Sequence, residues 1–180
     1  MLVFDLRRKP LKVLDTDRLT LRWLKLDDAA FIMELVNDPA WIRFIGDRNV
    51  HSVEDARAYI TTGPAAMYAR HGFGLYRVER KDDGVPIGLC GLIKRDNLDD
   101  VDIGFAFLPR FCGAGYAREA AAAVLAHGQR EFGLKRIVAI TSVDNERSIK
   151  LLEGIGLRFE KLTRLNTDSA DVKLFATSPA

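Results

Sequence analysis

Two glycines, Gly113 and Gly115, lie between an apolar run and an alanine-rich run, and their position suggests chemistry. The apolar run, residues 101–108, is typical of a strand, and the alanine-rich run that extends to Phe132 is typical of a helix. A strand, a glycine turn and a helix start direct unpaired backbone N–H groups and the positive end of a helix dipole at one point. Such a point binds phosphate or pyrophosphate, although the same glycines also suit an ordinary strand-to-helix turn.

The two best-known phosphate motifs do not fit this turn. A P-loop requires Gly-Lys-Ser/Thr, but Ala114 and Tyr116 occupy the relevant neighbourhood. A dinucleotide fingerprint requires a third glycine at the position of Arg118. The incomplete fingerprint argues against a nucleotide-binding α/β protein, which stays a rival interpretation that a comparison of ligands would test.

The residues around the turn are similar to motif A of the GNAT N-acetyltransferases. That motif, (Arg/Gln)-x-x-Gly-x-(Gly/Ala), is met by Arg110, Gly113 and Gly115. A second segment, residues 145–157, resembles the Asn-x-x-Ser-x-x-x-x-Glu-x-x-Gly-Phe pattern of the branch that contains the ribosomal-protein N-terminal acetyltransferases. Leu157 stands in place of the phenylalanine, which is an apolar exchange. The resemblance extends over nearly the whole chain.

The resemblance implies acetyl-coenzyme A as the acyl donor, held along the strand and the turn. Backbone N–H groups of the turn would hold the pyrophosphate, and the backbone of Phe107 and Leu108 would pair with the pantetheine arm like an added strand. In this family the strand separates from its neighbour there, and a backbone N–H polarises the thioester carbonyl. The donor-binding residues implied are Phe107, Leu108, Arg110, Cys112, Gly113, Ala114, Gly115, Tyr116, Ala117, Asn145 and Ser148.

Several of these residues also have a plainer explanation. Asn145 and Ser148 would lie beside the pantetheine and the sulfur, but Asn145 also suits a helix cap and Ser148 a solvated helix position. Cys112 is expected to contribute its backbone and not a nucleophile, because the family transfers the acetyl group directly. Glu119, in the first turns of the helix, is expected to be a structural partner.

The implied reaction is direct attack of a neutral amine on the thioester. An aliphatic amine is mostly protonated at pH 7, so a side chain or a water must accept a proton. Many GNAT enzymes place a tyrosine seven residues after the motif asparagine, and this position is Leu152 here. Ser148, or a water that it holds, would protonate the sulfur instead. The missing tyrosine also leaves open a non-catalytic acyl-coenzyme A-binding module.

Asp102 is the expected general base. Strand alternation places it on the same face as Gly104 and Ala106, where a carboxylate among small residues would meet an amine. A solvated aspartate next to a turn explains the same residue equally well. The acceptor is expected to be a primary amine, either a protein N-terminus or a small molecule. Trp41 and Phe44, together with Tyr59, are candidates for its pocket, but plain core packing explains them at least as well.

The composition suits a soluble globular protein of one domain, residues 1–180. Hydrophobic residues make up 48% and the formal net charge is +2, which gives no argument for nucleic acid. Cys90 and Cys112 form neither a disulfide framework nor a metal-ligand spacing, so a reduced, cytoplasmic setting is expected. No apolar run suggests a membrane span, and residues 1–10 do not resemble a signal peptide. Homodimers are common in the branch resembled.

The expected fold is α/β (α+β), with a mixed central sheet of about seven strands flanked by helices on both faces. A capping-box pattern predicts a helix start at Ser52, and Gly63-Pro64 is expected to interrupt that helix. The segment 101–141 is expected to be a parallel βαβ unit. The predicted strands are 13–26, 73–78, 87–93, 101–108, 136–141, 157–165 and 172–177. The predicted helices are 27–39, 52–60, 65–70, 116–132 and 146–153.

Overall fold

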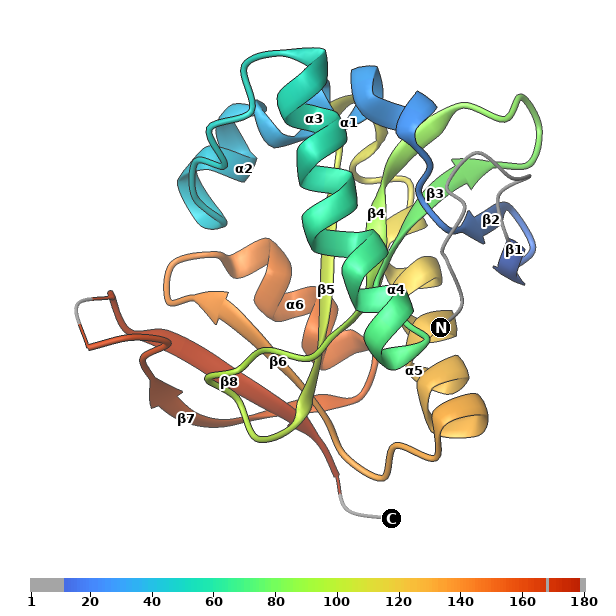
Figure 1. Cartoon of the computed structure of the whole chain (residues 1–180). Coiled ribbons are helices and arrows are strands. Elements are labelled where there is room, and N and C mark those ends of the chain that lie inside the picture. Colours follow the sequence, from blue (N-terminus) through green and yellow to red (C-terminus); the bar gives the residue numbers. More distant parts are fainter. Residues whose placement is uncertain (1–11, 168, 179–180) are drawn as a thin grey trace.

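One mixed sheet of eight strands organises the protein, with helices on both of its faces (Figure 1). The computed structural model describes residues 12–167 and 169–178, so the expectation for residues 1–10 lies outside the described part. The strand order is β1-β2-β3-β4-β5-β6-β8-β7. The strands are β1 (Lys12–Asp15), β2 (Leu19–Arg22), β3 (Leu75–Arg80), β4 (Pro86–Ile93), β5 (Val101–Phe107), β6 (Ile137–Ser142), β7 (Leu157–Thr163) and β8 (Val172–Thr177). The expected fold is confirmed, with slightly more strands than predicted.

The additional strand comes from the first predicted strand, which is in fact a hairpin. Residues 16–18 reverse the chain, and the Thr16 N–H donates to the Leu19 carbonyl at 2.9 Å. As a result β1 and β2 pair antiparallel, with Asp15 opposite Thr20. The apolar alternation along residues 19–23 is correct, but it belongs to the second strand of the pair alone.

The helices divide into two groups, one for each face of the sheet. The helices α1, α2 and α3 pack on one face, around Leu89 and Leu108. The helix α5 packs on the other face, against Leu92 and Ile103. No helix within residues 12–167 and 169–178 is long and apolar enough to cross a membrane. The helices are α1 (Ala29–Val36), α2 (Pro39–Phe44), α3 (Val53–Ile60), α4 (Ala66–His71), α5 (Tyr116–Phe132) and α6 (Glu146–Gly154).

Two helix starts follow from local sequence chemistry. At Ser52 the expected capping box is present: its hydroxyl accepts from the Asp55 N–H at 3.1 Å, and the Asp55 carboxylate accepts from the Ser52 N–H at 2.9 Å. Pro39 was expected to end or bend the helix predicted over residues 27–39. In the structure α1 ends at Val36, and Pro39 begins α2. Proline is favourable at the first helical position, and Asp38 caps the helix by accepting from the Ala40 N–H.

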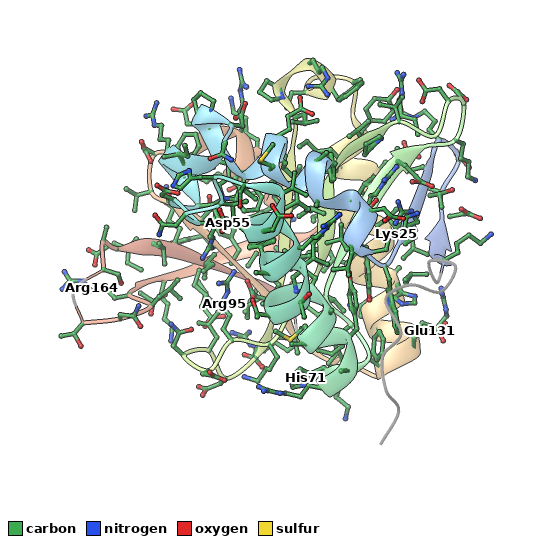
Figure 2. The ribbon with its side chains drawn as sticks, turned by 45° about the horizontal axis from the view of Figure 1, so that its top comes forward. Lys25, Asp55, His71, Arg95, Glu131 and Arg164 are labelled. Carbon is green, nitrogen blue, oxygen red and sulfur yellow. The ribbon has the colours of Figure 1, made fainter. Side chains whose placement is uncertain are left out.

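The expected break at Gly63-Pro64 is a π-helical turn. This turn, Thr61–Ala65, connects α3 to α4 without ending the helix. A π turn tolerates the proline because it widens the backbone ladder locally, and such turns are frequent at functional sites. Figure 2 shows Asp55 and His71 near opposite ends of the continuous helix.

The sheet opens between its two central parallel strands. β5 pairs with β6 only at Val101 with Ile137 and at Asp102 with Val138. Beyond that point β6 stays paired with β8, its neighbour on the other edge, whereas β5 and β6 diverge (Figure 1). The parallel βαβ unit and the separation implied by the family resemblance are therefore both present.

Candidate active site

A cavity of about 450 Å³ lies where β5 and β6 separate. One wall is formed by α2, α3 and the π turn, and the base by β4 and β5. The opposite side is formed by α6 and the start of α5, including Cys112, Ala117, Asn145 and Ser148. The cavity thus brings residues on either side of the glycine turn together with the second sequence motif, about thirty residues away in the chain. Gly113, Ala114, Gly115 and Tyr116 themselves are not among its lining residues.

The glycine turn has the backbone geometry expected of an anion cradle. Gly113 and Gly115 have φ values of 87° and 82°, a left-handed conformation that favours glycine. Gly115 is the N-cap of the 17-residue helix α5, whose first N–H groups have no partner within the helix. Nothing lies within 4 Å of where a Cβ of Gly113 would be, so the space beside the turn is open.

An ion pair from the N-terminal hairpin braces this turn. Arg18 donates to the Ala114 carbonyl at 2.9 Å and pairs with Glu119 at 2.6 Å. The Thr16 hydroxyl also donates to Glu119. Burial raises the pKa of Glu119, but these hydrogen bonds lower it below its usual value. Glu119 is therefore a charged structural partner, as expected.

Arg110 bridges the turn to a helix. Its guanidinium pairs with Glu34 of α1 and is about half exposed. Arg110 is not among the described residues that line the cavity. The motif arginine thus fixes the approach of the chain to the turn from outside.

Phe107 and Leu108 differ in the availability of their backbone groups. The Leu108 N–H donates to the Ile87 carbonyl at 2.9 Å, and its own carbonyl accepts from the Phe111 N–H at 2.9 Å. Because backbone groups alternate in direction along a strand, those of Phe107 face away from β4, toward the opening. Pairing with an added extended chain therefore falls to Phe107, not to Leu108.

Asn145 and Ser148 are joined at the start of α6. The Asn145 side-chain oxygen accepts from the Ser148 N–H at 3.1 Å, which is the helix cap anticipated as the plainer explanation. Both residues also line the cavity. The cap fixes the Asn145 amide at the cavity wall through the Ser148 backbone, so the two interpretations are compatible. Leu152, at the position where many GNAT enzymes have tyrosine, is buried and lines the same wall.

Asp102 lies at the closed end of the opening. Together with Gly104 and Ala106 it lines the cavity, but it is only 1% exposed, so the solvated alternative is wrong. The reason is Arg95, from the loop after β4, whose Nε lies 3.2 and 3.1 Å from the two carboxylate oxygens. Burial raises the pKa of Asp102, and the positive charge of Arg95 opposes that rise.

Aromatic and basic side chains also line the cavity. Trp41, Phe44 and Tyr59 all contribute to it, and Trp41 is at the same time part of the buried core. Burial raises the pKa of Tyr59, and the charges of Arg48 and Arg95 oppose the rise. Sequence reasoning missed both arginines because loop positions carry no periodicity. The glycine-proline pair of the π turn was the only signal that this helix is unusual.

The sheet separates between two parallel strands, and a glycine turn starts the helix that follows β5. Both features are those that the resemblance to acyl-transfer proteins implies. The chain belongs to the GNAT acetyltransferases: residues 18–158 match the family described as "Acetyltransferase (GNAT) domain". It is therefore an acetyltransferase enzyme, and the family supports acetyl-coenzyme A as the donor.

Known proteins match most of the chain in sequence or in fold. The uncharacterized N-acetyltransferase YoaA of Bacillus subtilis is 31% identical over 153 residues, which cover 84% of this chain and 86% of YoaA. A GnaT-family acetyltransferase from Bordetella pertussis has a TM-score of 0.75 at 26% identity, covering 95% of this chain and all of the other. RimL, an alpha-N-protein acetyltransferase solved in complex with coenzyme A, has a TM-score of 0.78 at 20% identity and shares the fold, covering 92% and 97%.

Proposed function

We propose that this enzyme transfers an acetyl group from acetyl-coenzyme A to a primary amine, by direct attack of the amine on the thioester. The observation that carries the proposal is the opening between β5 and β6, with Cys112, Ala117 and the capped start of α6 lining the cavity there. The opening leaves one edge of β5 without a strand partner beyond Asp102 in the described sheet. An extended ligand arm fits such an edge.

The donor side of the cavity suits a pyrophosphate and an extended arm. Backbone N–H groups from Gly113 to Ala117 lie at a positive helix end, and Gly113 leaves room for a close approach. The Cys112 N–H is already engaged, because it donates to the Pro109 carbonyl at 3.0 Å. The backbone of Phe107 faces the opening and is proposed to pair with the arm. A backbone N–H at the opening polarises the thioester carbonyl, which needs no particular side chain.

Two side chains are proposed to handle protons. Asp102, at the closed end of the opening, accepts a proton from the attacking amine, directly or through water. Ser148, held at the cavity wall by the Asn145 cap, donates a proton to the departing sulfur or holds the water that does so. A reduced, cytoplasmic setting and a homodimer stay predictions, as does the single domain.

The direct test is a screen of amines with detection of free thiol. Purified protein, acetyl-coenzyme A and each member of a panel of peptides and small amines are incubated, and release of the coenzyme A thiol is followed with a thiol reagent. Thiol release that depends on one class of amine supports the proposal. Binding of acetyl-coenzyme A without release for any amine would instead indicate the non-catalytic binding module.

A thermal-shift comparison separates the nucleotide-binding alternative. Acetyl-coenzyme A should raise the melting temperature of the protein more than NAD or ATP does at the same concentration, because bound ligand stabilises the native state. A larger shift with NAD or ATP would contradict the proposed donor.

A further inference from the structure

Arg95 presents an unused binding edge at the acceptor end of the cavity. Within the described part of the chain, both hydrogen bonds of Arg95 come from Nε and go to Asp102. The two terminal amino groups, which form the planar fork of the guanidinium, make none there. Arg95 lines the cavity, and its side chain is 30% exposed, whereas that of Asp102 is 1% exposed. The buried carboxylate thus holds the guanidinium in one orientation.

A second cation and a hydroxyl lie near this edge. Arg48, from the segment between α2 and α3, lines the same cavity and forms no ion pair among residues 12–167 and 169–178. The charges of Arg48 and Arg95 both act on the hydroxyl of Tyr59, which places the three groups in one region. In Figure 2, Arg95 lies alongside the middle of the helix that includes α3 and α4.

The anions of the cavity are already engaged. Three arginines line the cavity, namely Arg48, Arg95 and Arg147. Two aspartates line it as well, namely Asp38 and Asp102. Asp38 caps α2 by accepting from a backbone N–H, and Asp102 is bound by Arg95. The terminal amino groups of Arg95 have no acceptor among the described residues, and Arg48 and Arg147 have no carboxylate partner there, so the excess of positive charge at the cavity favours an anionic occupant.

We propose that the acceptor amine carries an anionic group, a carboxylate or a phosphate, which binds the terminal amino groups of Arg95. Arg48 adds positive charge, and the Tyr59 hydroxyl donates a hydrogen bond. The planar fork of arginine matches both kinds of anion bidentately. Asp102, which would receive the proton of the amine, and the fork of Arg95, which would bind the anion, are adjacent. The amine and the anionic group of the acceptor are therefore separated by only a few bonds. This inference rests on the proposed function and names the acceptor class for the same site.

The test compares acceptors that differ only in charge. Small-molecule acceptors are β-alanine, 2-aminoethyl phosphate and propylamine, and the peptide acceptors begin with Ser-Asp or Ser-Asn. Rates are compared at equal concentrations of neutral amine, with thiol release as the readout. The anionic member of at least one set is expected to have a kcat/KM at least tenfold above its neutral partner. The preferred set identifies whether the anion belongs to a carboxylate, a phosphate or an acidic peptide.

Variants assign the preference to named side chains. Arg48→Met should raise KM for the preferred anionic acceptor about tenfold, leave the rate with its neutral partner within twofold, and leave acetyl-coenzyme A affinity unchanged. Arg95→Met also removes the partner of Asp102, so the rates with both acceptors should change, and its readout is a tenfold loss of the anionic-over-neutral preference in kcat/KM. Arg57→Met is the control, because Arg57 is exposed on α3 and lies outside the cavity lining. Arg48→Met keeps the test decisive if loss of Arg95 unfolds the protein, since Arg48 is exposed and supports no other residue.

Three results would overturn the inference. They are equal kcat/KM for anionic and neutral partners, equal losses for both in the Arg95 and Arg48 variants, and no calorimetric binding of any anionic amine to protein saturated with coenzyme A. Failure of the proposed function itself looks different, because then no amine of either charge releases thiol. In that case the calorimetric arm still decides whether the anionic amines bind at the two arginines.

Discussion

Asp102 of β5 and Val138 of β6 are the last residues that pair before the two parallel strands separate. The pairing places a carboxylate at the closed end of the opening, where it is 1% exposed, lines the cavity and is bound by Arg95. A carboxylate in such a place has an altered proton affinity, and an altered affinity is measurable.

The first prediction concerns the pH dependence that Asp102 imposes. Burial raises the pKa of Asp102 and Arg95 only partly opposes it. A base is active when deprotonated, so kcat/KM should fall as pH falls through a value above the usual aspartate range. Asp102→Asn should remove that acid limb and lower kcat at least a hundredfold, the lower end for a general base. The exposed Asp27→Asn is the control, and an unchanged profile and turnover in Asp102→Asn would show that another group is the base.

The second prediction concerns the glycine turn. Gly113→Glu places a side chain and a negative charge at a left-handed position beside the proposed pyrophosphate site, so the Kd for acetyl-coenzyme A should rise more than tenfold. Gly133→Glu is the matched control: Gly133 also has positive φ and open space, but it lies at the other end of α5. Calorimetry measures both. Equal affinities in the two variants would place the pyrophosphate elsewhere.

The third prediction concerns the brace on that turn. Arg18→Met removes the hydrogen bond to the Ala114 carbonyl and leaves Glu119 without its cation. Hydrogen bonds that involve a charged group contribute about 1.5–3 kcal/mol, so urea unfolding should show a loss of that order together with weaker donor binding. Arg130→Met, on the same helix but in an exposed pair with Glu131, should change neither quantity. A stable Arg18 variant with normal affinity would mean that the turn holds its shape unaided.

The fourth prediction separates the two residues at the start of α6. Ser148→Ala should lower kcat while the Kd of acetyl-coenzyme A stays within twofold, because only the hydroxyl is removed. Asn145→Ala removes the cap and should lower the free energy of unfolding by about 1 kcal/mol. Single-turnover kinetics and urea unfolding measure the two effects. An unaffected kcat in Ser148→Ala would leave the sulfur to be protonated by bulk water.

The fifth prediction concerns acid stability at the other end of the sheet. Burial raises the pKa of Asp28, but hydrogen bonds and ion pairs with Arg22, and the charge of Arg77, lower it below the usual value. Its contribution to stability is therefore complete above the unfolded pKa of about 3.9 and is lost as pH falls through the lower folded value.

Asp28→Asn should accordingly lower the free energy of unfolding by about 3 kcal/mol at pH 7, because it breaks the buried pair with Arg22 and leaves Arg22 and Arg77 to share the one carboxylate of Glu79. The difference from the unaltered protein should shrink below pH 4. Urea unfolding at a series of pH values measures this. A difference that stays constant down to pH 3 would mean that Asp28 does not titrate with a lowered pKa.

Features that depend on neighbouring residues were the ones that sequence could predict. The Gly113 and Gly115 turn, the capping box at Ser52 and the Asn145 cap each involve residues within a few positions, and each has a distinctive composition. The split first strand shows the limit of this reasoning. Its alternating pattern lies in residues 19–23 alone, and the reversal at residues 16–18 contains neither glycine nor proline to mark it.

Features that depend on distant residues could not be predicted in the same way. Arg95 reaches Asp102 across a loop, and Arg18 reaches Ala114 and Glu119 from another strand. No local pattern encodes these distances, because the sheet topology creates them. The burial of Asp102 follows from one of these contacts, so strand alternation alone placed it on the correct face but in the wrong environment.

The cavity draws its two sides from separate stretches of chain. The helical wall, with its aromatic side chains and Arg48, comes from residues 35–67, whereas the glycine turn and the start of α6 come from residues 107–152. Acceptor preference therefore draws on residues 35–67 and on the loop that holds Arg95, whereas the donor side comes from later in the chain. Exchange of residues 35–67 together with that loop for the matching stretches of a relative should carry over the choice of amine and leave the donor side unchanged.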